Sequence, residues 1–172
     1  IDVDSSGNVY LNGTISIEDG TTLRSFGIVK LDTNGNLLWQ KCISGYASWG
    51  ESVKVTYTGN IYVSGQLQTR VGSGSYGDDF AIIKLDPFGN LIWGKTINSL
   101  SEHNIGTLFV DLSETVYLYG SHRSRENKLE SCILKINSNG DLIWYKLLGG
   151  VNEYGGQAYG RCIIVDNSGN IF

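Results

Sequence analysis

The sequence predicts an all-β fold made of repeated four-stranded antiparallel sheets, and three observations lead to this prediction. The chain repeats itself about every 50 residues. Its apolar runs are short and rich in Val, Ile, Tyr and Trp, and turn signals that contain Gly separate them. The 172 residues include 23 glycines and a single proline, which suits short strands joined by tight turns.

Two motifs carry the repeat. The first aligns without gaps as FGIVKLDTNGNLLWQK from Phe26, FAIIKLDPFGNLIWGK from Phe80 and SCILKINSNGDLIWYK from Ser131. The second interleaves with it, as GNVYLNG from Gly7, GNIYVSG from Gly59, ETVYLYG from Glu114 and GNIF ending at Phe172. Because two independent motifs keep one spacing, they indicate a structural repeat.

Each repeat reads as four short strands, which in the middle unit are expected at roughly 52–57, 60–65, 80–85 and 91–97. The third strand is apolar at consecutive residues such as Ile82 and Ile83, so both faces of the sheet are expected to be covered. A repeated sheet of this kind is a blade of a β-propeller. We predict three four-stranded blades at about 1–44, 52–98 and 107–148, with the start of a fourth at about 161–172.

The phase of the repeat predicts a ring that is incomplete in this chain. The chain opens inside a first strand at Ile1–Asp4 and closes one period later, at 163–172. Three blades cannot close a ring, since propellers use about 4–8. We therefore expect further residues on both sides. The alternative is an oligomer in which copies complete the ring, but the duplicated last strand would compete with Ile1–Asp4 of the next copy.

A family resemblance follows from VDSSGNVYLNG at Val3–Gly13 and KLDPFGNLIW at Lys84–Trp93. The units resemble the SBBP repeat of bacterial and archaeal seven-bladed β-propellers, over nearly the whole chain. The resemblance implies the propeller fold and a secreted or surface-attached protein, and it implies no shared catalytic residues. One departure is Ser113–Thr115, where the other copies have a Gly-Asn turn, so that turn is expected to be distorted.

Composition excludes two classes of partner. The net charge is −4 and the pI is about 5.1, and no basic run is present, so nucleic acid is not expected to bind. No apolar run reaches about 18 residues, so no membrane insertion is expected. Cys42, Cys132 and Cys162 show no metal or redox spacing and are expected to be small buried thiols.

Residues that recur in every copy are best explained by architecture. Trp39, Trp93 and Trp144 are therefore interpreted as largely buried packing wedges between blades. The lysines that recur with them are expected to snorkel at blade edges and pair with carboxylates.

No catalytic or metal site and no cofactor is predicted. Asp2, Asp4 and Ser6 alternate as in a calcium loop, but the closing glutamate is absent, because position 13 is glycine. His103 and His122 are expected in different loops without a fixed companion. A glycan could attach at the Asn12-Gly13-Thr14 sequon only in a glycosylating secretory route.

What remains is an asymmetry between the two ends of the blades. One set of connections is short and repetitive, whereas the other diverges between copies at 14–25, 66–79, 121–130, 44–51, 98–106 and 149–161. Varied loops on a rigid scaffold are where binding usually resides, although unconstrained solvent loops would look the same. The candidate ligand-binding residues in these loops are Trp49, Tyr76, Asp78, Asp79, His103, His122, Arg123, Tyr154 and Tyr159.

The sequence therefore predicts a non-enzymatic binding or structural module, extracellular or at the cell surface, within a larger protein. Its partners would be a protein or a glycan at the variable loops, together with the remaining blades of the same protein or further copies. The alternative is a segment of a propeller enzyme that acts on glycans, a hydrolase or lyase, whose catalytic acids lie largely outside this chain.

Overall fold

The computed structural model describes residues 1–16, 24–43, 48–71, 75–97, 103–123, 129–148, 163–166 and 168–172. These residues form strands and turns and contain no helix, as the sequence predicts. Every paired strand is antiparallel to its partner, and each lies beside its neighbour in the sequence.

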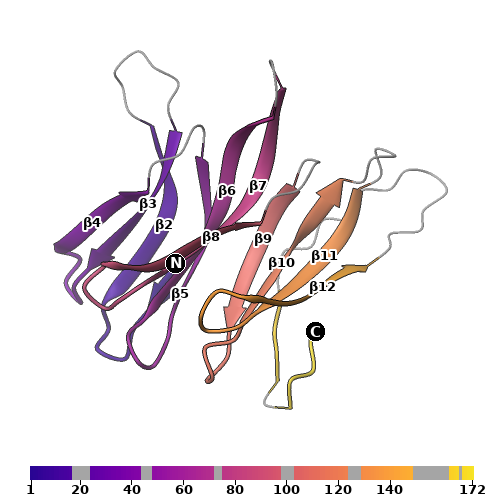
Figure 1. The fold of residues 1–172 in the computed structure, drawn as a ribbon. Coiled ribbons are helices and arrows are strands. Elements are labelled where there is room, and N and C mark those ends of the chain that lie inside the picture. The colour runs from indigo at the N-terminus through magenta and orange to yellow at the C-terminus, as the bar shows by residue number, and fades with distance from the viewer. Residues whose placement is uncertain are drawn as a thin grey trace.

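Three four-stranded sheets stand side by side (Figure 1). The first contains β1 (Asp2–Val3), β2 (Val9–Ser16), β3 (Arg24–Leu31) and β4 (Leu37–Ile43). The second contains β5 (Ser48–Val55), β6 (Ile61–Val71), β7 (Ser75–Leu85) and β8 (Leu91–Ile97). The third contains β9 (His103–Val110), β10 (Val116–Arg123), β11 (Leu129–Ile136) and β12 (Leu142–Leu148).

The three sheets repeat one register, residue for residue. The repeated lysine lies opposite the repeated tryptophan in each sheet, as Lys30–Trp39, Lys84–Trp93 and Lys135–Trp144, and the register shifts directly after that lysine. An isolated bridge between Val165 and Ile171 repeats the Val3–Val9 pairing of the first sheet. The chain is thus a β-propeller segment of three blades and the start of a fourth, and the sheets do not close into a ring.

The core lies between the sheets rather than within one of them. Phe26 and Ile28 of the first sheet pack against Val63 and Ile83 of the second. Ile82 lies on the opposite face of the second sheet and packs against the third. Adjacent residues of β7 are therefore buried on opposite faces, which explains why this strand is apolar without alternation.

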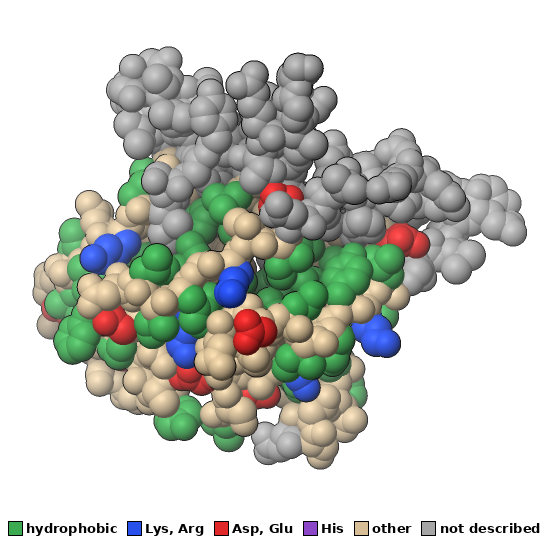
Figure 2. All heavy atoms as spheres, in the orientation of Figure 1, with side chains coloured by type: hydrophobic (Ala, Val, Ile, Leu, Met, Phe, Trp, Pro, Cys, Tyr) green, Lys and Arg blue, Asp and Glu red, His purple; other side chains and the backbone are tan. Residues whose placement is uncertain are grey.

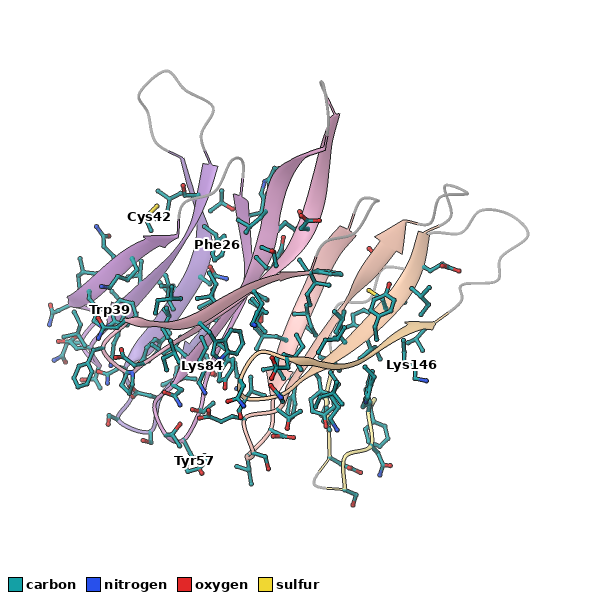
Figure 3. The ribbon with its side chains drawn as sticks, viewed as in Figure 1. Phe26, Trp39, Cys42, Tyr57, Lys84 and Lys146 are labelled. Atoms are coloured by element: carbon teal, nitrogen blue, oxygen red, sulfur yellow. The ribbon has the colours of Figure 1, made fainter. Side chains whose placement is uncertain are left out.

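The outward face of the first sheet is apolar but uncovered. Val3 is 53% exposed, whereas its counterpart Val55 in the second sheet is 9% exposed. Leu11 is likewise 36% exposed, and its counterpart Val63 is fully buried. Cys42, on the outermost strand β4, is exposed and free rather than buried as expected (Figure 3). The face has the pattern of an interface without a neighbouring sheet against it.

The repeated tryptophans occupy equivalent places but are half-buried, because they lie on the outermost strand of each sheet. Trp93 donates a hydrogen bond from Nε1 to the carbonyl oxygen of Ser138 in the third sheet, at 3.0 Å. A Cβ atom at Gly140 would lie 3.1 Å from the Trp93 ring. The ring of Trp39 lies against Gly89 in the same way, while Gly35 of the first sheet has open space around it. Trp39 and Trp93 therefore pack on the glycine turn of the next sheet, whereas Trp144 packs against the buried cluster of Tyr117, Ile133, Ile163 and Val165.

This contact predicts unequal costs for the same substitution at two equivalent turns. Gly35 and Gly140 have φ of 83° and 85°, so an alanine is strained at either position by about 1 kcal/mol. We expect Gly140→Ala to cost about 1 kcal/mol more than Gly35→Ala, because only its Cβ meets a neighbouring ring. Urea unfolding of the two variants measures the difference, and equal costs would contradict the packing role of Trp93.

Candidate functional site

The two ends of the sheets differ in kind. At one end, called here the turn end, all the described connections are one and the same tight turn. Each turn has five residues, such as 32–36. The backbone amide of the first residue donates to the carbonyl oxygen of the fifth, and the amide of the fourth donates to the carbonyl oxygen of the first. At Asp32 the carboxylate also accepts bonds from the Asn34 and Asn36 amides and from the Asn36 side chain. The Asn36 side chain leads the bonds that lower the pKa of Asp32.

The opposite end, called here the loop end, diverges between the sheets. Strands β6 and β7 have 11 residues each, whereas their counterparts in the other sheets have eight. Their pairing continues up to Val71 and Ser75, and the two strands project beyond the rest of the second sheet (Figure 1). The predicted loop at 66–79 is therefore wrong over most of its length.

The base of this projecting hairpin is tightly packed. Gln66 is 6% exposed and Asp79 is 2% exposed, although both residue types are usually at the surface. Trp49 on β5 lies opposite Gln66, and it is half-buried. Of the predicted binding residues, Trp49 and Asp79 are thus brought to the root of the hairpin. Tyr76 and Asp78 come before Asp79 on β7 and so lie nearer the tip of the hairpin. The structure describes Tyr76 and Asp78 by their backbone alone.

The two histidines are also placed on strands rather than in loops. His103 on β9 lies directly opposite His122 on β10, and His122 in turn lies opposite Glu130 on β11. Strand pairing thus places the backbones of the two histidines opposite one another. Arg123 follows at the end of β10, and the backbone alone is described at Arg123 and both histidines. Tyr154 and Tyr159 lie outside the described residues.

The acids that resembled a calcium loop are occupied by protein groups. Asp2 accepts a bond from the Val55 amide at 2.7 Å and pairs with Lys54 Nζ at 3.1 Å, so it links the first two sheets. Asp4 accepts bonds from the backbone of Ser6 and Asn8 within its own turn. Among the described residues, no group of three His, Cys, Asp or Glu side chains could hold a metal ion.

Asn12 of the sequon has a structural role that sequence reasoning missed. Its Nδ2 atom donates to the carbonyl oxygens of Ser52 and Ser64, both at 3.0 Å, in the second sheet. A glycan would have to attach to this same nitrogen, so the folded sheet pair does not offer it. The sequence held one indication that Asn12 has a role of its own. The equivalent residues in the other copies are Ser64 and Tyr119, so this asparagine is not part of the repeat.

One carboxyl group near the hairpin departs from the others. Glu51 sits at a bulge in β5, between paired residues Gly50 and Ser52, and partial desolvation raises its pKa while the residue remains exposed. By contrast, hydrogen bonds within their own turns lower the pKa of Asp4, Asp32, Asp86 and Asp166. A raised pKa is the property that a general acid requires, whereas the lowered values fit turn caps.

On the face shown in Figure 2, lysine, arginine and acidic side chains stand singly among hydrophobic and other residues. No helix among the described residues is long and apolar enough to cross a membrane.

No protein-family model matches the chain, and none of the curated proteins matches it either.

The packed root of the hairpin predicts that Asp79 contributes to stability. Asp79→Ala should lower the free energy of unfolding by about 1–3 kcal/mol, because it removes a buried polar group on which neighbouring groups depend. The exposed Asp141 provides the matched control, and Asp141→Ala should cost less than about 1 kcal/mol. Denaturant unfolding of both variants tests this, and equal costs would show that the hairpin root is not packed as described.

Proposed function

We propose that this chain is a non-enzymatic binding and structural module, part of a larger secreted or cell-surface protein, whose blades are SBBP-type repeats. Its ligand, a protein or a glycan, binds at the loop end. The β-propeller serves as the rigid scaffold, and the connections that diverge between copies provide the specificity.

The projecting β6–β7 hairpin is the observation that carries this proposal. A binding surface needs side chains held away from the scaffold on a rigid base, and the hairpin extends the second sheet by regular strand pairing up to Val71 and Ser75. Its root is anchored by the buried Gln66 and Asp79. The turn end instead repeats one turn in every sheet, as architecture alone would require.

The residue types at the loop end support a polar or carbohydrate ligand. The candidate set combines aromatic side chains with acids, histidines and an arginine, which are the groups that stack on and hydrogen-bond to such ligands. Trp49 contributes a half-buried indole beside the hairpin. No nucleic acid is proposed as a partner, because the chain is acidic.

The second candidate is a hydrolase or lyase that acts on glycans, and Glu51 is the residue that favours it. Its raised pKa suits a proton donor. Glycoside hydrolysis needs a second carboxyl group within about 5–10 Å of the first, as nucleophile or base. We place that partner outside this chain, which makes this candidate the weaker one.

Shortening the hairpin tests the proposal. Leu67 and Asp79 lie opposite each other, so replacing 68–78 by Asn-Gly closes a two-residue turn at that pair. The probe is a panel of immobilised polysaccharides and extracellular matrix proteins. Any ligand that binds the parent chain should bind the shortened variant at least about tenfold more weakly, because the projecting surface is lost.

The control is a change at the turn end. Tyr57 and Phe88 are 74% and 77% exposed at turn tips, and Figure 3 shows Tyr57 at that end. Tyr57→Ala and Phe88→Ala should leave binding unchanged. Loss of binding in these variants but not in the shortened one would overturn the proposal. Release of new sugar ends from the polysaccharides, abolished by Glu51→Gln, would establish the enzyme instead.

A further inference from the structure

The second sheet lacks an acid that the first sheet uses. In the first sheet, Asp4 Oδ2 accepts bonds from Asn8 Nδ2 at 2.8 Å and from the Tyr10 hydroxyl at 3.0 Å, and Lys30 Nζ lies 3.9 Å away. The second sheet keeps the equivalent donors Asn60, Tyr62 and Lys84 but has Thr56 in place of the aspartate. Its donor groups therefore face a position that their own sheet leaves without a carboxylate.

Glu114 of the third sheet supplies that carboxylate. Its Oε1 accepts bonds from Asn60 Nδ2 at 2.9 Å and from the hydroxyls of Thr56 and Thr58. Its Oε2 accepts bonds from the Tyr62 hydroxyl at 3.0 Å and from Lys84 Nζ at 2.7 Å. In the first sheet, the donors are bound by Asp4 of the same sheet. In the second sheet, the equivalent donors are bound by an acid from the next sheet.

The backbone at Glu114 is strained to allow this contact. Its φ is 58°, in the left-handed region, where the equivalent residues are Gly7, Gly59 and Gly169. The turn nevertheless keeps its normal hydrogen bonds, from Glu114 N to Asp111 O and from Asp111 N to Thr115 O, so the expected distortion is absent. A strained side chain at a glycine position persists only where its contacts over-determine it.

A glutamate from the neighbouring sheet can replace the aspartate at only one of two interfaces. The first interface lies between the first and second sheets, and the second lies between the second and third sheets. A Cβ atom at Gly59 would lie 3.0 Å from Pro87 Cγ, and a proline ring yields little. The residue equivalent to Pro87 in the third sheet is Ser138, and a glutamate fits at 114. The first interface therefore keeps its acid within one sheet, as Asp4, and the second receives its acid from the neighbour.

We infer that Glu114 is the specificity determinant that fixes which sheet packs against the β5–β8 sheet. A neighbour with glycine at this position would leave Lys84, which is 7% exposed, buried without a counter-ion. Removing one partner of a buried ion pair is far more costly than an ordinary surface change. Copies of a nearly uniform repeat could otherwise pack in a wrong order, which is a characteristic failure of repeat proteins.

The ionisation of Glu114 supports the same reading. Burial of the carboxyl favours its neutral form, but the bonds from Lys84, Thr58, Asn60 and Tyr62 overcome this effect and lower the pKa of Glu114 to about 2. The charged groups around it are Lys84 and, on the third sheet, Asp111, which also helps to raise the pKa of Tyr62. Because folding lowers the pKa of Glu114, the carboxylate stabilises the folded state above about pH 4.5. This contribution to stability is lost as the pH falls toward 2.

A double-mutant cycle between the two sheets tests the inference. Glu114→Gly should raise the unfolding equilibrium constant by about 10- to 100-fold, even though glycine relieves the strained φ. Thr56→Asp alone should not increase stability, because two carboxylates would then compete for the same hydrogen-bond donors and repel one another. The double variant T56D/E114G recreates the Asp4–Gly59 combination of the first interface and should return to within about threefold of the parent.

The matched control uses the first interface. Asp4→Thr removes the equivalent acid elsewhere, so its effect and that of Glu114→Gly should add, whereas Thr56→Asp and Glu114→Gly should be strongly coupled. The stability difference between the parent and Glu114→Gln should also shrink as the pH falls from about 4.5 to 2.

Each outcome of the cycle is decisive. If Glu114→Gly does not fold, recovery of folding in T56D/E114G supports the inference, and failure of both overturns it. Additive effects of Thr56→Asp and Glu114→Gly, or a parent-to-Gln difference that does not change with pH, would show that Glu114 is an ordinary turn residue.

Discussion

The fold depends on the fact that each sheet is apolar on both faces, so that no sheet is stable without a neighbour. Ile82 and Ile83, adjacent on β7, are buried against different sheets. A sheet with only one apolar face would form a sandwich with one partner, whereas two apolar faces require a continuing stack. Two tryptophans extend the same principle to the outer strands, since the rings of Trp39 and Trp93 lie on the glycine turns of the next sheets.

A polar layer at the turn end makes this otherwise uniform packing specific. Hydrophobic faces of similar size could be exchanged between copies, because burial is not directional. The tyrosine and lysine of each sheet are directional, since a lysine held over a tyrosine ring, as Lys84 is over Tyr62, still needs a carboxylate in a fixed place. In the first sheet that carboxylate is Asp4, and in the second it is Glu114 of the neighbour. Two departures from the repeat, at Thr56 and Glu114, thus compensate one another.

The repeat was sufficient to predict the sheets, because two motifs with one spacing fix the number of strands in each unit and their approximate positions. The β6–β7 hairpin was predicted as a loop, although Gln66–Val71 alternates in a way that suits a strand. Strand pairing beyond the repeat depends on a partner that local sequence does not reveal. For the same reason His103 and His122 were predicted in loops rather than on paired strands, and the pairing of Glu114 with Lys84 could not be predicted from residues 30 positions apart.

The two ends of the sheets are under different constraints, and this difference bears on where a ligand would bind. At the turn end, Asp2 pairs with Lys54 and Glu114 with Lys84 between sheets, while aspartates such as Asp32 and Asp86 cap their own turns. A substitution there changes packing before it could change recognition. At the loop end, the hairpin extends beyond the rest of the second sheet on a root formed by Gln66 and Asp79 (Figure 1). We therefore expect substitutions to be tolerated better at the loop end than at the turn end, where side chains hold the sheets and turns together.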